Sequence, residues 1–179
     1  MSVIEAISKS DEETRAFKNA MRHLASAVSV MTTGRGEQRT GFTASSVTSL
    51  SMEPPTLLVC LNRQSSAAPV LLEHGAFCIN VLAKDQVSLA DAFAGRDGRR
   101  GAARYSDARW QQMPSGALGN PDAIAQIDCQ LEEVIERHSH FILLGRPTHI
   151  HVRERSEPLV YWHGAYQALA DLNRAAGRP

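Results

Sequence analysis

The stretch GFTASSVTSLSMEPPTLLVCLN, residues 41–62, decides the fold and the site that we expect in this chain. Its first half is crowded with small and hydroxylated side chains, namely Thr43, Ala44, Ser45, Ser46, Thr48, Ser49 and Ser51. Such residues bury little area, so an ordinary core strand gains little from them. Small side chains let a ligand approach the backbone, and hydroxyls can bond its polar groups. We therefore predict that this stretch forms one wall of a cofactor pocket.

Strand-like segments surround this stretch on both sides. The apolar run 56–62 follows a double proline and is typical of a buried strand. Further strands are predicted at residues 28–33, 39–51 with an irregularity near the serines, 77–82, 127–137, 140–152, 158–162 and 166–169. Because consecutive strands lie close in sequence and helices are few, we expect a mainly β fold, a β-barrel with flanking helices, as a single domain.

Three helices and one long loop complete the predicted elements. Ser10 and Glu13 form a capping box that predicts a helix start, and this helix is expected to end near Leu24. Two shorter helices are predicted at residues 69–73, closed by Gly75, and from Asp85 to Phe93. Residues 95–121 hold most of the remaining glycines and prolines, which indicates a long surface loop.

The bulk composition excludes several classes of function. The chain has 179 residues, 43% of them hydrophobic and 21% charged, and its formal net charge is zero. This balance favours neither a nucleic-acid partner nor an anionic membrane surface. Arg99, Arg100 and Arg104 form a local basic run, but they fall in the glycine-rich segment and are interpreted as a solvated loop.

The three cysteines and the N-terminus indicate the compartment. Cys60, Cys78 and Cys129 lie in or beside apolar strand-like sequence and have no CxxC spacing, so we expect free thiols in a reducing cytosol. The acidic N-terminal segment has no long apolar region of the kind found in secretory signals, and no stretch approaches a transmembrane length. We therefore expect a cytoplasmic protein with no membrane partner.

Five segments, taken in order, resemble the flavin reductase-like family, the small reductase components of two-component flavin monooxygenases. The quoted stretch matches the family pattern Gly-x-Thr-Ala-Asn/Ser-Ser followed by Ser-x-x-Pro-Pro and an apolar strand. The other four are FKNAMRHLASAVSVMTT at 17–33, FCINVLAKDQ at 77–86, HSHFILLGRP at 138–147 and PLVYWHGAYQAL at 158–169. Two features depart from the family: His138 and Ser139 replace a glycine and an aspartate, and residues 95–121 fit poorly.

The resemblance implies an FMN-binding split barrel, usually a homodimer with flavin sites near the subunit interface. It implies an NAD(P)H:flavin oxidoreductase that reduces FMN or FAD and supplies the reduced flavin to a separate oxygenase. NADH is the expected donor because no arginine cluster obviously awaits a 2′-phosphate, although the loop arginines Arg96, Arg99 and Arg100 keep NADPH open. The expected organisation is an N-terminal arm at 1–14, the domain at 15–170 and a C-terminal tail at 171–179.

A flavin needs a flat slot, backbone partners for its pyrimidine edge and an anion site for its phosphate. We assign the slot to four residues, Thr43, Ala44, Ser45 and Ser46, and the backbone edges to Cys60, Leu61 and Asn62. The phosphate is assigned to four residues at an expected helix start near Ser66, namely Asn62, Arg63, Ser65 and Ser66.

Three further residues are weaker candidates. Asn80 lies on the neighbouring predicted strand and could contact the cofactor. His140 and Tyr166 match a family histidine beside the nicotinamide site and a closing aromatic residue near the cofactor mouth. Each also has a purely structural interpretation, as a strand histidine or a core aromatic. No catalytic side chain is expected, because hydride passes between the two cofactors.

Other functions remain as alternatives. The histidine pairs His138/His140 and His149/His151 have the i, i+2 spacing that suits a metal, but no third or fourth ligand is evident and no metal is predicted. No Rossmann glycine motif, P-loop or nucleophile elbow is present. The competing hypotheses are a non-enzymatic FMN-binding electron carrier on the same fold, and a flavin-dependent reductase of another acceptor.

Overall fold

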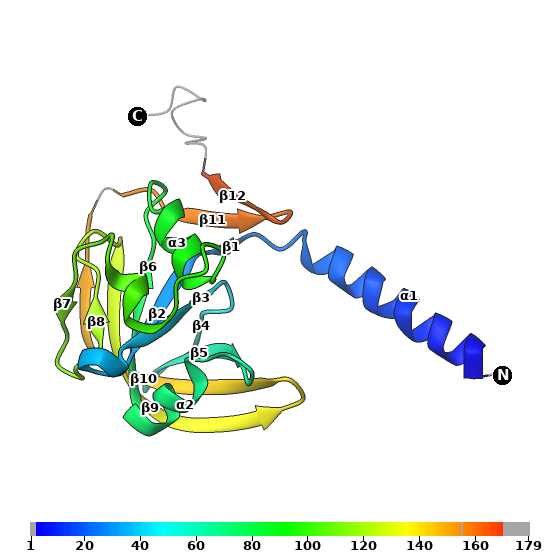
Figure 1. Ribbon diagram of the computed structural model, residues 1–179, viewed down its shortest axis with the longest axis horizontal. Coiled ribbons are helices and arrows are strands. Elements are labelled where there is room, and N and C mark those ends of the chain that lie inside the picture. The colour runs from blue at the N-terminus through cyan, green and yellow to red at the C-terminus, as the bar shows by residue number, and fades with distance from the viewer. Residues whose placement is uncertain (1–2, 155, 170–179) are drawn as a thin grey trace.

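The computed structural model describes residues 3–154 and 156–169, and side chains from Asp11 onward. Its centre is a seven-stranded antiparallel sheet in the order β3-β2-β6-β9-β10-β5-β4 (Figure 1). The strands are β2 (Ser29–Thr33), β3 (Thr40–Ala44), β4 (Thr48–Met52), β5 (Pro55–Asn62), β6 (Ala76–Val81), β9 (Ala125–Arg137) and β10 (His140–Val152). The predicted mainly β architecture with helices on the outside is confirmed.

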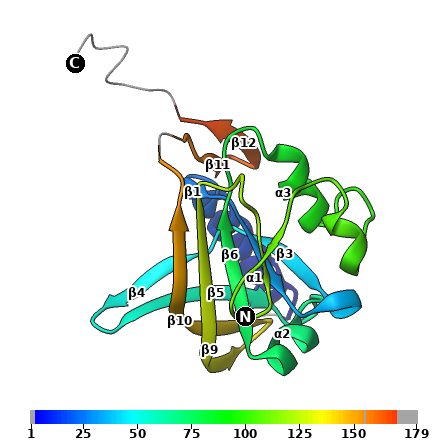
Figure 2. The same cartoon turned by 90° about the vertical axis from the view of Figure 1, so that its left-hand side faces the viewer.

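Two small sheets and three helices surround the large sheet. One small sheet joins β1 (Ser26–Ala27), β11 (Leu159–Trp162) and β12 (Ala165–Ala168), and the other joins β7 (Gln111–Gln112) and β8 (Leu118–Gly119). The helices are α1 (Val3–Met21), α2 (Ala68–His74) and α3 (Val87–Phe93), with 3-10 turns η1 (Gly36–Gln38) and η2 (Gly101–Tyr105). Figure 2 shows β9 and β10 as long neighbouring strands, as the predicted hairpin requires.

The irregularity predicted near the serines is a break between two strands. β3 ends at Ala44, and β4 begins at Thr48 after a bend at Ser45. The glycine that opens the motif is required by packing, because a Cβ on Gly41 would lie 2.2 Å from the Met31 carbonyl oxygen and 2.7 Å from the Phe93 ring. Only glycine lets β3 approach β2 and α3 this closely.

Three predictions about helices and loops were wrong. α1 begins at Val3 and runs without a break through Ser10, so Ser10 is not its cap. α3 begins at Val87, and Gln86 rather than Asp85 binds the preceding backbone by accepting a hydrogen bond from the Ala83 N–H at 2.9 Å. Residues 95–121 are not a plain surface loop, because they contain η2, β7 and β8 and bury Arg104 and Tyr105.

The core lies on the two faces of the large sheet. One cluster packs beneath α2 around Leu71, Phe77 and Leu143, and a second packs beneath α3 around Leu82 and Phe93. Gly75 closes α2 in the left-handed conformation (φ 65°), as predicted. The sheet and these two helices hold the end of β3 and the segment after β5 in fixed positions.

Candidate functional site

The end of β3 lines a pocket of about 170 Å³, which we call the ring pocket. Its walls come from the end of β3, the loop after α3, the β1–β2 junction, β11 and β12. The lining residues are Val28, Thr43, Ala44, Ser45, Ala94, Arg96, Tyr161 and Tyr166. The Thr43 hydroxyl donates to the Ala90 carbonyl at 2.6 Å and Ala44 is buried in the core, whereas Ser45 is exposed. Ser46 is exposed as well, but it does not line this pocket, so Ser45 is the exposed motif residue that faces a ligand here.

Aromatic rings and one cation close the other side of the ring pocket. Tyr161 and Tyr166 are paired across β11 and β12, and their rings meet edge to face with centroids 5.6 Å apart. The Arg96 guanidinium lies 5.2 Å from the Tyr166 ring centroid and pairs with Asp91 at 2.8 Å. Burial raises the pKa of Tyr166, so its hydroxyl stays protonated at neutral pH.

The predicted backbone edge on β5 has partners inside the chain. The Ser46 hydroxyl accepts from the Cys60 N–H at 3.3 Å and donates to the Cys60 carbonyl at 3.4 Å. Leu61 is buried in the core, and the Asn62 amide oxygen accepts from the Gln64 N–H at 2.9 Å. The Ser46–Cys60 contacts therefore fasten the bend after β3 to β5, and the Asn62 amide fixes the turn that follows β5.

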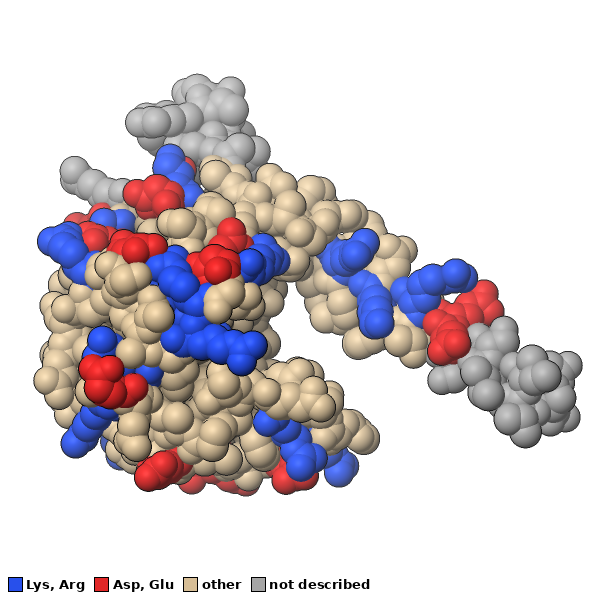
Figure 3. Space-filling model, viewed as in Figure 1, with Lys and Arg blue, Asp and Glu red and all other residues tan. Residues whose placement is uncertain are grey.

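A second pocket, of about 330 Å³, lies between the segment after β5 and the loop after α3, and we call it the arginine pocket. It is lined by Gln64, Ser66, Gly95, Gly98, Arg99, Arg100 and Arg104. Basic side chains gather in the middle of the face that Figure 3 shows. Ser66 is the predicted phosphate residue that the structure brings to this pocket, and Gln64 and the arginines were missed.

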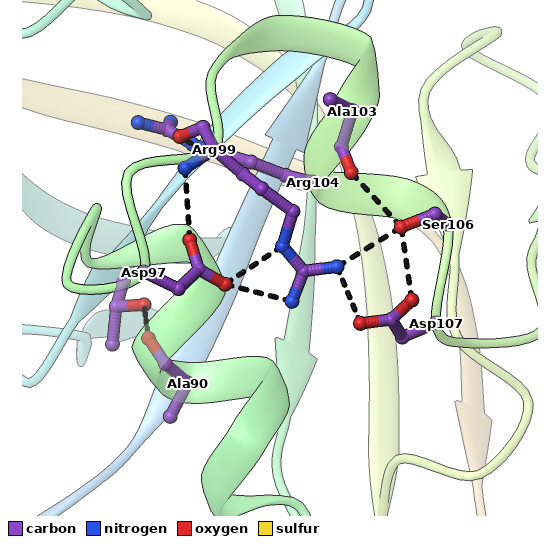
Figure 4. A network of polar contacts seen from close by, with 8 residues as sticks. Ala90, Asp97, Arg99, Ala103, Arg104, Ser106 and Asp107 are labelled. Atoms are coloured by element: carbon purple, nitrogen blue, oxygen red, sulfur yellow. Dashed lines mark hydrogen bonds and ion pairs between the residues drawn. The ribbon is translucent and has the colours of Figure 1, made fainter.

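Internal contacts give the arginine pocket its shape (Figure 4). Arg99 is held by Asp97 at 2.7 Å, by the Ser106 hydroxyl at 2.9 Å and by Asp107. Arg104 is buried and donates to the Gly41 carbonyl at 2.5 Å and the Arg99 carbonyl at 3.1 Å. Among the residues that the structure describes, neither Arg100 nor Arg104 has a carboxylate partner, so the pocket keeps a positive charge suited to an anion. The sequence feature that could have indicated this anion site is the presence of three arginines within residues 99–104.

The remaining phosphate candidates lie beside a third pocket. Arg63 forms an ion pair with Glu136 at 2.6 Å and donates to the His138 carbonyl at 3.2 Å, so its charge is already matched. The Ser65 hydroxyl accepts from the Ala67 N–H at 3.3 Å. This third pocket, of about 490 Å³, is lined by Asn62, Arg63, Gln64, His138, Ser139 and Phe141.

His140 lies next to the third pocket and is exposed. It faces Asn62 across the β10–β5 ladder, and its Nδ1 lies 2.9 Å from the Ser139 hydroxyl. His138 adopts φ 50°, a left-handed conformation that glycine accepts more easily. The departure from the family at 138 is thus a strained turn position beside His140.

Asn80 is placed away from these pockets. It is fully buried, and its amide nitrogen donates to the Val30 and Leu118 carbonyls at 3.2 and 3.4 Å. Its amide oxygen accepts from the Asn120 N–H at 2.6 Å. These contacts leave no free polar group on Asn80 for a cofactor. The Asn80 side chain instead holds the segment around Asn120 in place.

Similarity to known proteins shows the family of this chain. The profile of the flavin reductase like domain matches residues 21–170. The chain belongs to the flavin reductase-like family. One member, the FMN reductase (NADH) RutF of Cronobacter sakazakii, is 37% identical over 158 residues, which cover 88% of this chain and 94% of the relative. RutF of Escherichia coli is 37% identical over 159 residues, covering 89% and 94%.

Solved structures of the family share the fold. BorF, the flavin reductase component of a bacterial two-component tryptophan halogenase, superposes with a TM-score of 0.81 at 31% identity, over 88% of this chain and 99% of BorF. The flavin reductase PheA2 superposes with a TM-score of 0.80 at 29% identity, over 88% and 98%. The expected family and its split-barrel fold are therefore confirmed.

The residues present fit a flavin. The ring pocket offers a small-residue wall and tyrosine rings, and the arginine pocket offers unmatched positive charge. The two pockets adjoin, because Ala94 and Arg96 line the first and Gly95 lines the second. Within the described part of the chain, no three metal-binding side chains come close enough together to hold an ion. None of the described helices has the length and apolar character needed to cross a bilayer.

Proposed function

We propose that this chain is an NADH-dependent flavin reductase that binds FMN or FAD across the two adjoining pockets and supplies reduced flavin to a separate oxygenase. The observation that carries the proposal is that a small-residue, tyrosine-lined pocket lies next to an arginine-lined pocket, with residues 94–96 lining one or the other. That pairing suits a molecule with a flat ring at one end and a phosphate at the other. The named relatives, two FMN reductases (NADH) and two flavin reductases, support it.

The bound flavin supplies the chemistry by accepting hydride from a dihydronicotinamide. The chain's own residues bind and orient it. Ser45 and the Tyr161–Tyr166 pair hold the ring, and Arg100, Arg104 and Ser66 hold the phosphate. The other residues predicted to bind flavin support this site: Thr43, Ser46 and Cys60 fasten its wall by hydrogen bonds, and Ala44 and Leu61 pack behind it.

The nicotinamide is assigned to the open side of the ring pocket. Tyr166 lines that pocket, and His140 stands at the rim of the third pocket with an exposed imidazole. The third pocket shares Gln64 with the arginine pocket, so a dinucleotide seated in the third pocket lies beside the bound flavin. His140→Ala should therefore raise the KM for NADH more than it changes the affinity for flavin.

The test is NADH oxidation, followed by the loss of NADH absorbance in anaerobic and aerated samples with FMN, FAD or no added flavin. Rapid oxidation that depends on added flavin supports a diffusible-flavin reductase and ranks the two flavins. A protein that purifies yellow and leaves NADH unchanged would refute the reductase and favour the electron carrier. Oxidation that requires some other acceptor would refute the transfer of free flavin.

A homodimer is part of the proposal, and α1 supports it. Figures 1 and 3 show this helix standing away from the body of its own chain. Every side chain from residue 11 to 25 is exposed, and Phe17, Met21 and Leu24 keep 66%, 45% and 59% of their area accessible. A helix with no tertiary packing is marginal in water, so a second copy that covers this apolar stripe accounts for its stability.

The oligomeric state tests this part separately. Phe17→Glu should convert a dimer into monomers in light scattering coupled to gel filtration, whereas Asn19→Glu, two residues along and on another side of α1, should not. A wild-type protein that is a monomer would refute the proposed homodimer.

We also propose that the protein is cytoplasmic. Cys60, Cys78 and Cys129 are free thiols, as expected in a reducing compartment, and cell fractionation tests this location.

A further inference from the structure

Arg96 is the charged residue of the ring pocket. Of the eight described residues that line this pocket, the other seven are apolar, hydroxylated or aromatic: Val28, Thr43, Ala44, Ser45, Ala94, Tyr161 and Tyr166. The function proposed above does not use this charge, because the phosphate is assigned to the arginine pocket. A cation placed against the ring, and away from the phosphate, acts on the charge of the ring itself.

Three contacts hold Arg96 in place. Its backbone N–H donates to the Asp91 carbonyl at 3.1 Å, and its Nη1 lies 2.8 Å from the Asp91 carboxylate. Its guanidinium carbon lies 5.2 Å from the centroid of the Tyr166 ring. Both side chains of the ion pair remain partly accessible, at 50% for Arg96 and 35% for Asp91, so a bound ring would face a fixed but incompletely neutralised cation.

The charge of the ring changes during the reaction. NADH donates a hydride, two electrons with one proton, and the neutral oxidised ring becomes a reduced anion while NADH becomes NAD⁺. The negative charge of that anion is delocalised over the pyrimidine half of the flavin. A nearby cation therefore stabilises the reduced state and has little effect on the neutral oxidised ring, and a carboxylate beside the cation opposes the effect.

We propose that Arg96 stabilises the reduced flavin anion in the ring pocket, and that Asp91 limits this stabilisation so that reduced flavin leaves for its acceptor. The inference rests on the proposed flavin reductase function. The Arg96–Asp91 ion pair would set how tightly the reduced flavin is held, and therefore both how readily the flavin is reduced and how quickly it is released. It requires the pyrimidine half of the ring to face Arg96. Arg96 is a specificity-determining residue for the oxidation state, and Asp91 is a positioning residue that acts through it.

The test compares affinities for the two oxidation states of FMN, measured by fluorescence with oxidised FMN and, without oxygen, with FMN reduced chemically. Arg96→Gln should weaken binding of reduced FMN about 10-fold and change binding of oxidised FMN less than about 2-fold. For a two-electron couple, that ratio lowers the potential of the bound flavin by about 30 mV. Arg96→Lys, which keeps the charge, should restore most of the ratio.

Asp91→Asn should act in the opposite direction. It keeps the shape of the side chain and removes the charge, so binding of reduced FMN should tighten about 3- to 10-fold and its release should slow. In the double variant Asp91→Asn/Arg96→Gln this gain should be smaller than in Asp91→Asn alone, because part of the effect of Asp91 comes from its pairing with Arg96. Arg39→Gln is the matched control: Arg39 lies 5.7 Å from the Tyr105 ring but outside both pockets, and its loss should leave the ratio unchanged.

The outcomes separate this inference from the proposed function. Equal weakening of both oxidation states by Arg96→Gln, or a gain from Asp91→Asn that is just as large without Arg96, would overturn the inference. Chemical reduction makes the measurement independent of NADH, so a protein that binds FMN with the expected ratio but does not oxidise NADH would refute the reductase and leave the role of Arg96 standing. Failure to bind either form of FMN would refute both.

Discussion

Arg100 provides the sharpest test of the arginine pocket. The residue is exposed, lines the pocket beside Ser66 and has no carboxylate partner in the described part of the chain. At a separation of about 5 Å and an effective dielectric constant of about 40, between those of a protein surface and water, one pair of unit charges contributes about 1.7 kcal/mol. Arg100→Gln should therefore weaken FMN binding about 15-fold at low ionic strength, with a smaller loss as salt is added.

Riboflavin supplies the control for this prediction, because it carries the same ring without the phosphate. Its affinity should be the same for the wild type and for Arg100→Gln. Arg109→Gln is the matched variant: Arg109 belongs to the same loop but pairs with Asp122 and lines neither pocket. Titrations of flavin fluorescence measure each of the three proteins with each of the two ligands. An equal loss for FMN and riboflavin, or no loss for FMN, would refute the phosphate assignment.

Three further predictions concern the wall, the interior and the pH dependence. Ser45→Leu should abolish flavin binding and leave the melting temperature unchanged, since Ser45 is exposed; a normal titration would remove it from the ring pocket. Asn80→Ala should lower the free energy of unfolding by about 3 kcal/mol in urea titrations, because it leaves the buried Asn120 N–H without a partner and removes the hydrogen bonds to the Val30 and Leu118 carbonyls; a neutral effect would contradict that network. Burial, with a smaller contribution from Arg35, lowers the pKa of His74 in the folded state, so its share of stability is present above about pH 6.5 and is lost as the pH falls below that value. His74→Gln should flatten this part of a stability–pH curve, and an unchanged slope would argue against it.

Much of the fold could be predicted because local sequence and tertiary structure agree. The strand at 56–62 is observed as Pro55–Asn62, and the hairpin at 127–152 is observed with its turn in place. The prediction of a helix start at Ser10 was wrong, because a local capping pattern does not exclude helix on its N-terminal side. In the structure α1 extends back to Val3. The prediction of a surface loop at 95–121 was wrong, because glycine content indicates turns but does not show which residues are buried.

The candidate site also contains residues that the sequence indicated and residues that it did not. Ser45 and Ser66 line pockets, so both remain candidates for binding flavin. The sequence could not show that Arg63 would be matched by Glu136, or that Arg100 and Ser66 would line the same pocket. Such pairings join residues far apart in the chain, so they depend on strand register and on a loop that only the folded structure places.

The loop after α3 also protects the sheet. β3 is an edge strand of the large sheet, and η2 packs against it: Arg104 and Tyr105 donate to the carbonyls of Gly41 and Thr40 at 2.5 and 2.6 Å. Edge strands with free backbone groups can pair with other chains, so this cover also guards against aggregation. The sequence of the loop is thus constrained twice, and variants selected there for altered ligand preference should lose solubility whenever they disturb either carbonyl contact.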